Sequence, residues 1–343
     1  MIKDHKLNNI NKKNVDTAQV TEILEITKAI ASQNTTEVLN IFKRHTYWPN
    51  TLNKKLIQAL TIYSNDSNIR IKEIILILLN KSADPDTLID KPGNKKDKIT
   101  SIILTSMKAD VQLIKELIKF KPNINFKDSQ NKNALIHLLL SYNGTQENEL
   151  AECVLLLIHS KININTEDND GHTALTIASF RGMYNIANML LKHGGNIDHQ
   201  VKNDGNNTSL HYAVNTGSIN LIKVLLSYKP NLLLLNNHLR SSLDEATIKK
   251  YTEIYNILAE EQRKRSLEIK DDKSFRLDTT FSNNHNIYNN QMINNNVSAT
   301  SSEASPKHKN KNTSFNNNKQ NVYNNNNISN DNNFNYVRQN NIY

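Results

Sequence analysis

One short pattern recurs five times in this chain of 343 residues, and its near-constant spacing restricts the possible folds more than any other feature. Each copy has two leucines or isoleucines, a few polar residues, and then one residue flanked on both sides by Asn or Asp. In the last copy Leu233 replaces the second Asn or Asp. Repetition of this kind predicts a stack of similar units. The copies follow one another at 39, 40, 33 and 35 residues, and they start at Leu78, Leu117, Leu157, Leu190 and Leu225.

Two short helical patterns precede each copy. In the unit at residues 168–200, Thr173 is typical of a helix start, and Gly182 ends the first pattern because it tolerates a left-handed backbone. Helices of about ten residues are marginal alone in water, so the pairs must share a core. The sequence predicts an all-α solenoid of roughly six to seven helix pairs over residues 21–266. The second pattern, near residues 184–193, has apolar residues at i, i+1, i+4 and i+5, namely Ile186, Ala187, Leu190 and Leu191.

A hexapeptide identifies the kind of repeat. Thr208-Ser209-Leu210-His211-Tyr212-Ala213 matches the Thr-Pro-Leu-His-x-Ala motif of ankyrin repeats, with Ser in place of Pro. Residues 173–178 keep the Thr, Leu and Ala of this motif, whereas residues 133–138 keep only the Leu. The chain therefore resembles the ankyrin-repeat family. This resemblance implies a structural role for His211, because the motif histidine bonds backbone within its repeat.

The resemblance covers residues 21–266 and implies an ankyrin-repeat solenoid there. The clearest repeats are 168–200 and 203–235, and the polar last unit, 237–266, is expected to be a capping repeat. Two insertions interrupt the pattern, and we expect both to be loops outside the stacked helices. One lies between the helices of a middle unit, Asn143 to Glu147, and the other precedes the unit before it, Lys91 to Lys98.

The resemblance also implies where a partner protein binds. In the family, ligands contact the loop tips and the exposed side of each first helix, which line the concave face. Phe180 and Arg181 are of special interest, since aromatic and arginine residues are enriched among interface anchors. An alternative is that Phe180 packs against the neighbouring repeat as part of the core. By position, the expected partner-binding residues are Ser129, Gln130, Lys132, Asn169, Asp170, His172, Phe180, Arg181, Gln200, Asn207, Asn215 and Thr216.

No motif for catalysis stands out in the sequence. The chain has eight glycines, none in a phosphate-binding cluster, and it lacks a nucleophile elbow and a zinc-protease motif. The single cysteine, Cys153, lies in an apolar run and is expected to be a small buried residue. His193 and His199 could approach each other, but exposed or helix-capping roles are expected for them. We therefore expect no enzyme activity, no cofactor and no metal.

Charge and hydropathy restrict the partners. The net charge is +9, but the 42 basic residues are mostly lysine, which favours a protein partner over nucleic acid. The longest apolar run, Ile74 to Leu79, is too short to span a membrane. The first residues lack the apolar core of a signal peptide. We expect a monomer in the cytoplasm, or one exported into a host cell without a cleavable signal peptide.

Both ends of the chain differ from the repeats in composition. Residues 1–20 form a polar leader, and residues 267–343 form an Asn-rich tail; both are expected to be disordered, since they offer little apolar surface to bury. The Asn- and Lys-rich chain resembles ankyrin-repeat proteins of intracellular bacteria, some of which act inside host cells. An alternative function is a scaffold whose tail self-associates while the repeats recruit cargo.

Overall fold

A computed structural model describes residues 21–44 and 49–271, with side chains described up to residue 267. The expected leader at 1–20 and the Asn-rich tail from residue 272 lie outside the described residues. The described residues fall into two units, with the boundary between Ala259 and Glu260.

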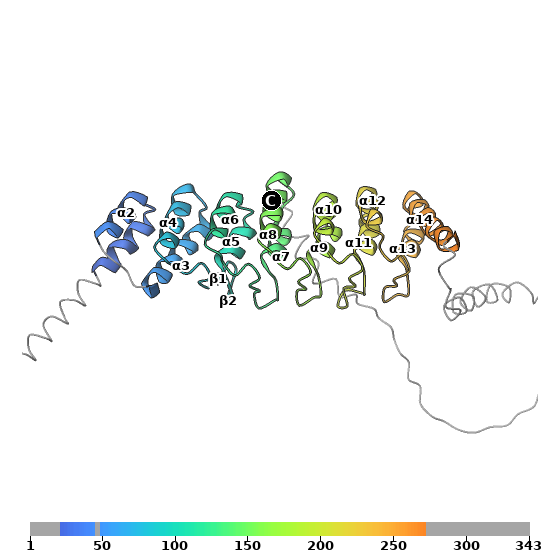
Figure 1. Ribbon diagram of the computed structural model, residues 1–343. Helices are drawn as coiled ribbons and strands as arrows, with labels where there is room; N and C mark the ends of the chain where they lie inside the picture. The colour runs from blue at the N-terminus through green and yellow to red at the C-terminus, as the bar shows by residue number, and fades with distance from the viewer. Residues whose placement is uncertain (1–20, 45–48, 272–343) are drawn as a thin grey trace, which may run out of the picture. The chain divides into compact units, whose positions relative to one another are not determined.

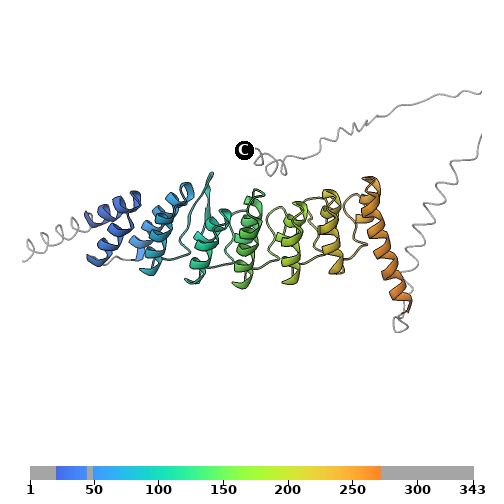
Figure 2. The ribbon, with the colours of Figure 1, turned by 90° about the horizontal axis from the view of Figure 1, so that it is seen from above.

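The first unit consists of helix pairs that follow one another in a row, as Figures 1 and 2 show from two directions. Seven pairs occur within the described residues, which confirms the expected mainly helical repeat architecture. Residues 21–31 are helical and pair with the next helix. In chain order the remaining helices are α2 (Thr35–Arg44), α3 (Pro49–Asn65), α4 (Ile69–Asn80), α5 (Ser101–Met107), α6 (Val111–Ile118), α7 (Ala134–Ser141), α8 (Glu147–His159), α9 (Ala174–Phe180), α10 (Tyr184–Lys192), α11 (Ser209–Thr216), α12 (Ile219–Ser227), α13 (Ser242–Ile248) and α14 (Thr252–Asp271).

A β-hairpin interrupts the helices, which the sequence did not predict. Strands β1 (Ile89–Lys91) and β2 (Asn94–Ile99) pair antiparallel, with Ile89 opposite Ile99. Gly93 occupies the turn with φ +80°, a conformation that glycine adopts without strain. The Lys-rich segment was expected to be a loop. The hairpin is thus a two-stranded insertion in an otherwise helical repeat fold within the described residues.

Capping side chains begin most of the first helices. Thr173 accepts a hydrogen bond from the backbone N–H of Thr176, and Thr208 accepts one from that of His211. These bonds satisfy N–H groups that the first turn of a helix leaves without partners. Gly182 and Gly217 follow the helices with φ of +69° and +68°, which confirms the predicted helix breaks.

The core runs along the row of first helices. All residues of α9 are buried except Phe180, because α7 and α11 flank α9 and its partner α10 packs against it. Helix α10 is buried on one side only, through Ile186, Ala187, Leu190 and Leu191, as its sequence pattern predicts. Cys153 is fully buried, and burial raises the pKa of its thiol to about 12, consistent with a packing role.

The insertion predicted between the helices of a middle repeat is a loop, because residues 142–146 separate α7 from α8.

The end of the helical region differs from the sequence expectation. Helix α14 continues to Asp271, past the expected boundary at residue 266. Its part in the second unit carries ion pairs of Glu260 with Lys264 at 2.9 Å and of Glu261 with Arg265 at 2.7 Å. These i, i+4 pairs support an exposed helix.

Candidate functional site

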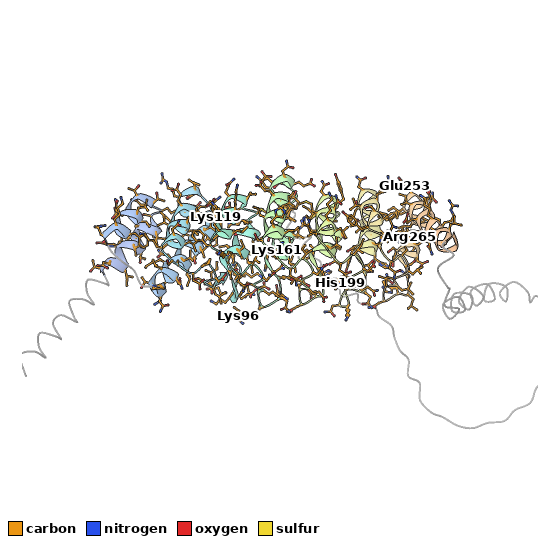
Figure 3. All side chains as sticks on the ribbon, viewed as in Figure 1. Lys96, Lys119, Lys161, His199, Glu253 and Arg265 are labelled. Carbon is orange, nitrogen blue, oxygen red and sulfur yellow. The ribbon has the colours of Figure 1, made fainter. Side chains whose placement is uncertain are left out.

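The loops between helix pairs project from one side of the first unit (Figure 1). In Figure 3, Lys96 and His199 mark this loop side, and Glu253 marks the opposite edge. We refer to the loops at residues 89–99, 127–132, 167–172, 202–207 and 236–241 as the hairpin loops.

The recurring Asn/Asp motif links each repeat to the next. Asn165 Oδ1 accepts a hydrogen bond from the backbone N–H of Asn196 at 2.8 Å, and its Nδ2 donates to the carbonyl of Gly194 at 2.9 Å. The same acceptor position is filled by Asp86, Asn125 and Asp198, which accept from residues 123, 163 and 231. The motif is therefore a ladder of hydrogen bonds along the stack.

The first Asn or Asp of each motif shapes its own turn. Asn163 Oδ1 accepts from the backbone N–H of Asn165, and Asn196 Oδ1 accepts from that of Asp198. Asparagine and aspartate favour such turns because their short side chains reach the backbone two residues ahead. The first Asn or Asp of the motif thus stabilises its own turn, and the second binds the next repeat.

A second set of bonds joins the tips of the hairpin loops. The backbone N–H of Asn169 donates to the carbonyl of Gln130 at 3.0 Å, and Asn169 Nδ2 donates to the carbonyl of Ser129 at 3.2 Å. Asn169 Oδ1 accepts from Asn131 Nδ2 at 2.6 Å, and its carbonyl accepts from Asn203 Nδ2 at 3.1 Å. The exposed tips are therefore held in place by their neighbours.

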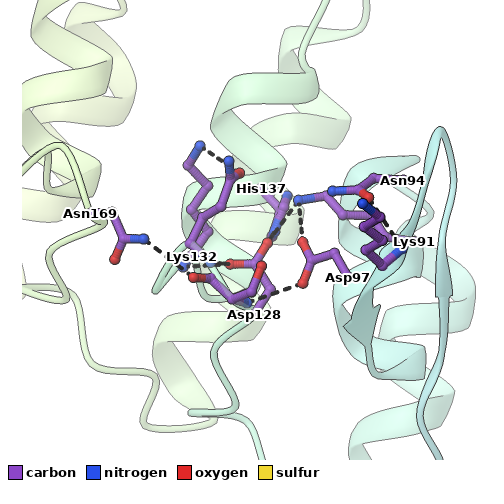
Figure 4. Close-up of polar contacts among 10 residues, drawn as sticks. Lys91, Asn94, Asp97, Asp128, Lys132, His137 and Asn169 are labelled. Carbon is purple, nitrogen blue, oxygen red and sulfur yellow. Dashed lines mark hydrogen bonds and ion pairs between the residues drawn. The ribbon is translucent and has the colours of Figure 1, made fainter.

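Four side chains form a buried polar cluster between the β-hairpin and the next loop (Figure 4). Lys91 Nζ lies 3.1 Å from Asp97 Oδ2 and 2.8 Å from Asp128 Oδ2. His137 Nε2 lies 2.9 Å from Asp128 Oδ2. Buried charges are tolerated when they are paired and hydrogen-bonded, as here. The cluster therefore fixes the β-hairpin against the repeat that follows.

The electrostatics of this cluster keep both aspartates ionised. Burial tends to raise the pKa of Asp128, but hydrogen bonds from His137, Lys91 and the backbone of Lys132 outweigh it and hold the pKa below its usual value. The pKa of His137 is lowered, chiefly because burial disfavours the imidazolium form. The contact of His137 with Asp128 is thus a hydrogen bond from a neutral imidazole.

One position on the first helices secures the loops and was not recognised in the sequence. His137 bonds Asp128, Tyr212 Oη donates to Asp204 Oδ2 at 2.5 Å, and Glu245 Oε1 accepts from Asn236 Nδ2 at 3.0 Å. All three lie four residues after the N-cap of their helix. Their residue types differ, so no single letter marks this position. Its spacing from the N-cap is the only signal in the sequence.

The structure separates the expected partner-binding residues into three groups. Half-buried residues are Lys132, Phe180, Arg181, Gln200 and Asn207, whereas His172 is buried. Lys132 Nζ donates to Gln130 Oε1 at 3.1 Å, which brings two of the expected residues together. Exposed residues are Ser129, Gln130, Asn169, Asp170, Asn215 and Thr216.

His172 does not lie on the surface, contrary to the sequence expectation. It is 6% exposed, and its ring lies 6.1 Å from that of Tyr212 in the next repeat. Burial is the main cause that lowers its pKa. His172 therefore belongs to the packing between repeats.

Phe180 and Arg181 also contact neighbouring repeats. The Phe180 ring meets Tyr212 edge-on at 6.0 Å, in agreement with the alternative packing role. Arg181 Nη1 donates to the carbonyls of Leu139 at 2.5 Å and Leu140 at 3.1 Å, and its Nη2 donates to that of Tyr142. These carbonyls lie at the end of α7, so Arg181 caps the preceding repeat.

Polar residues farther along the row have similar structural roles. Gln200 Nε2 donates to the carbonyls of Asn206 and Leu235, and His199 Nε2 lies 2.8 Å from the carbonyl of Gly171. His193 Nδ1 lies 2.8 Å from the carbonyl of Met189. His211 contacts Thr208 through Nδ1 and the carbonyl of Arg240 through Nε2, which confirms its structural role.

Two other kinds of site are absent from the part of the chain that the structure describes. Within the described residues, no group of three or more His, Cys, Asp or Glu side chains is arranged to hold a metal ion. No helix in that part of the chain has the length and apolarity needed to cross a membrane.

A row of helix pairs joined by bonded hairpin loops defines a helical repeat protein. Two models of ankyrin repeats match the chain, one of three copies at residues 102–203 and one of many copies at residues 190–246. Residues 102–246 of the chain therefore consist of ankyrin repeats, and such repeats indicate a module for protein–protein interaction.

Two similar proteins from Arabidopsis thaliana are named as E3 ubiquitin-protein ligases. XBAT34 is 26% identical over 37% of this chain and 33% of its own length. XBAT35 is 26% identical over 36% of this chain and 26% of its own length. The chain thus spans at most about a third of these relatives, so their ligase names describe those proteins.

Proposed function

We propose that the chain is a non-catalytic module that docks a partner protein on its hairpin loops, around residues 168–200. The observation that supports this is the combination of exposure and rigidity at the loop tips. Asn169 is exposed, yet all its bonds go to adjacent hairpin loops. A surface ordered before binding loses little conformational entropy when a partner docks.

The contact surface that we propose is narrower than the sequence expectation. It consists of the exposed residues at the loop tips and at the end of α11, and His172 and Arg181 are excluded because they serve contacts between repeats. The proposed contact residues are Ser129, Gln130, Asn169, Asp170, Asn215 and Thr216.

Charge reversal at the loop tips tests this proposal. Partners captured by the intact chain are identified by mass spectrometry, and the binding of one purified partner is then measured by calorimetry. Asp170→Lys should weaken binding at least tenfold without changing the melting temperature, because its side chain is exposed. Glu253→Lys, on the opposite edge (Figure 3), is the matched control. Equal affinity for both variants would exclude the loop surface.

An assembly scaffold is the second candidate function, favoured by the Asn-rich composition of residues 281–343. It predicts that the intact chain forms larger species than a chain ending at residue 271, as measured by sedimentation velocity. Identical sedimentation of the two chains would eliminate self-association through the tail. A role as an effector in a host cell is a further proposal, and it rests on composition alone.

A further inference from the structure

An open groove of about 370 Å³ lies between α3 and the β-hairpin, away from the contact surface proposed above. Helix α3 contributes Ile57 and Thr61 to its walls, and the β-hairpin contributes Asp90, Lys95 and Lys98. Leu88, just before β1, completes the lining. The groove therefore exists only because the Lys-rich segment folds as a hairpin.

The groove combines apolar surface with unpaired positive charge. Ile57 is 36% exposed and Leu88 is 45% exposed, although both are large aliphatic residues. Lys98 pairs with Asp90 across the hairpin, and Lys91 points inward to the buried aspartates. Within the described residues, neither Lys95 nor Lys96 forms an ion pair. A ligand for this groove must therefore supply carboxylates as well as an aliphatic group.

The sheet beside the groove has an open edge. Within residues 21–44 and 49–271 it contains only β1 and β2, so β1 pairs with β2 on one side and with no other described strand. Edge strands recognise extended peptides through backbone hydrogen bonds, and side chains in adjacent pockets supply specificity. An extended segment is thus the conformation that suits a groove running along β1.

We propose that this groove binds an extended segment of a partner protein in which acidic residues neighbour an aliphatic one. The aliphatic side chain contacts Ile57 and Leu88, and the carboxylates face Lys95, the lysine of the lining that forms no ion pair within the described residues. Single-stranded nucleic acid fits less well, because binding sites for it combine arginine with aromatic platforms, whereas this lining is lysine and aliphatic. The groove is a second contact in addition to the contact surface around residues 168–200.

Peptide selection on the full-length chain tests the proposal. Random 12-residue peptides are displayed on phage and selected, and the affinity of the best peptide is measured by fluorescence anisotropy. We expect enrichment of Asp and Glu next to Leu, Ile or Val. Selection of no peptide, or of peptides without this enrichment, would overturn the proposal.

Variants then locate the binding site. Lys95→Glu should weaken binding of the selected peptide at least tenfold, as should Ile57→Ser, while Lys161→Glu is the matched charge control. The lysine variant is decisive by itself if Ile57→Ser impairs folding. Unchanged affinity in that variant overturns the proposal, as does tighter binding of a 20-nucleotide oligothymidine that displaces the peptide. Asp170→Lys should leave the peptide affinity unchanged, which separates this groove from the loop surface.

Discussion

Arg181 has a different role from the one that its residue type suggests. Its guanidinium donates to backbone carbonyls at the end of α7, about 40 residues earlier in the chain. Hydrogen bonds that involve a charged group contribute about 1.5–3 kcal/mol each, and partial exposure of Arg181 reduces this. We expect Arg181→Ala to lower the free energy of unfolding by about 2 kcal/mol in urea titrations.

A lysine at this position serves as the control. Arg181→Lys keeps the charge but cannot present the planar fork of donors, so it should recover less than half of the lost stability. Unchanged stability in the alanine variant would contradict the capping role.

The sequence marks such residues as important without showing what they contact. Arg181 and Phe180 were identified because their types are common in interfaces, yet both contact adjacent repeats. Every residue type has a backbone carbonyl, so the sequence does not indicate which carbonyls at a helix end Arg181 contacts. The same limit applies to His172, whose burial depends on Tyr212 in the next repeat.

The contact between Asp128 and His137 of α7 should respond to pH. The pKa of His137 lies below its ordinary value, chiefly because of burial, and the same holds for His211. In the pH range between the pKa of these histidines in the folded chain and their pKa in the unfolded chain, the unfolded chain binds protons that the folded chain does not. Stability is therefore full above about pH 6.5 and falls as the pH decreases through this range.

His137→Gln measures the contribution of this residue. Glutamine can still donate to Asp128 but does not titrate, so stability should depend less steeply on pH between 6.5 and 5 by up to about 1.4 kcal/mol per pH unit. The measurement is urea unfolding at a series of pH values. Parallel curves for the two proteins would show that His137 does not titrate in this range.

Elements differ in how well the sequence predicts them. The sequence predicts the pair α9 and α10 from local signals, because Thr173, Gly182 and the apolar spacing all lie within one repeat. The β-hairpin has only Ile89 and Ile99 as buried aliphatic residues. Its position depends on the ion pair of Lys91 with Asp128, which belongs to the next repeat. No pattern within residues 89–99 records that contact.

From Asp86 to Asn231, the Asn/Asp ladder couples neighbouring repeats. Stability in a repeat protein is approximately the sum of the repeats and their interfaces. Asn165→Ala removes two bonds to the next repeat, so we expect a loss of about 1 kcal/mol and a broader urea transition, since exposed hydrogen bonds are modest.

Asn165→Asp provides the comparison for this rung. It retains the acceptor, as Asp86 and Asp198 do naturally, and it should retain most of the stability. If both variants unfold like the unchanged chain, the rung does not couple the repeats.

The ladder also has a direction and an end. Every acceptor serves the repeat that follows it, and Leu233 occupies the acceptor position in the last copy, where it is 56% exposed. A repeat duplicated within the ladder would find both a donor and an acceptor, whereas a repeat inserted directly after Leu233 would find no acceptor side chain at that position. Lengthening of such proteins by gene duplication is therefore expected to occur in the interior of the array, with the final unit inherited unchanged.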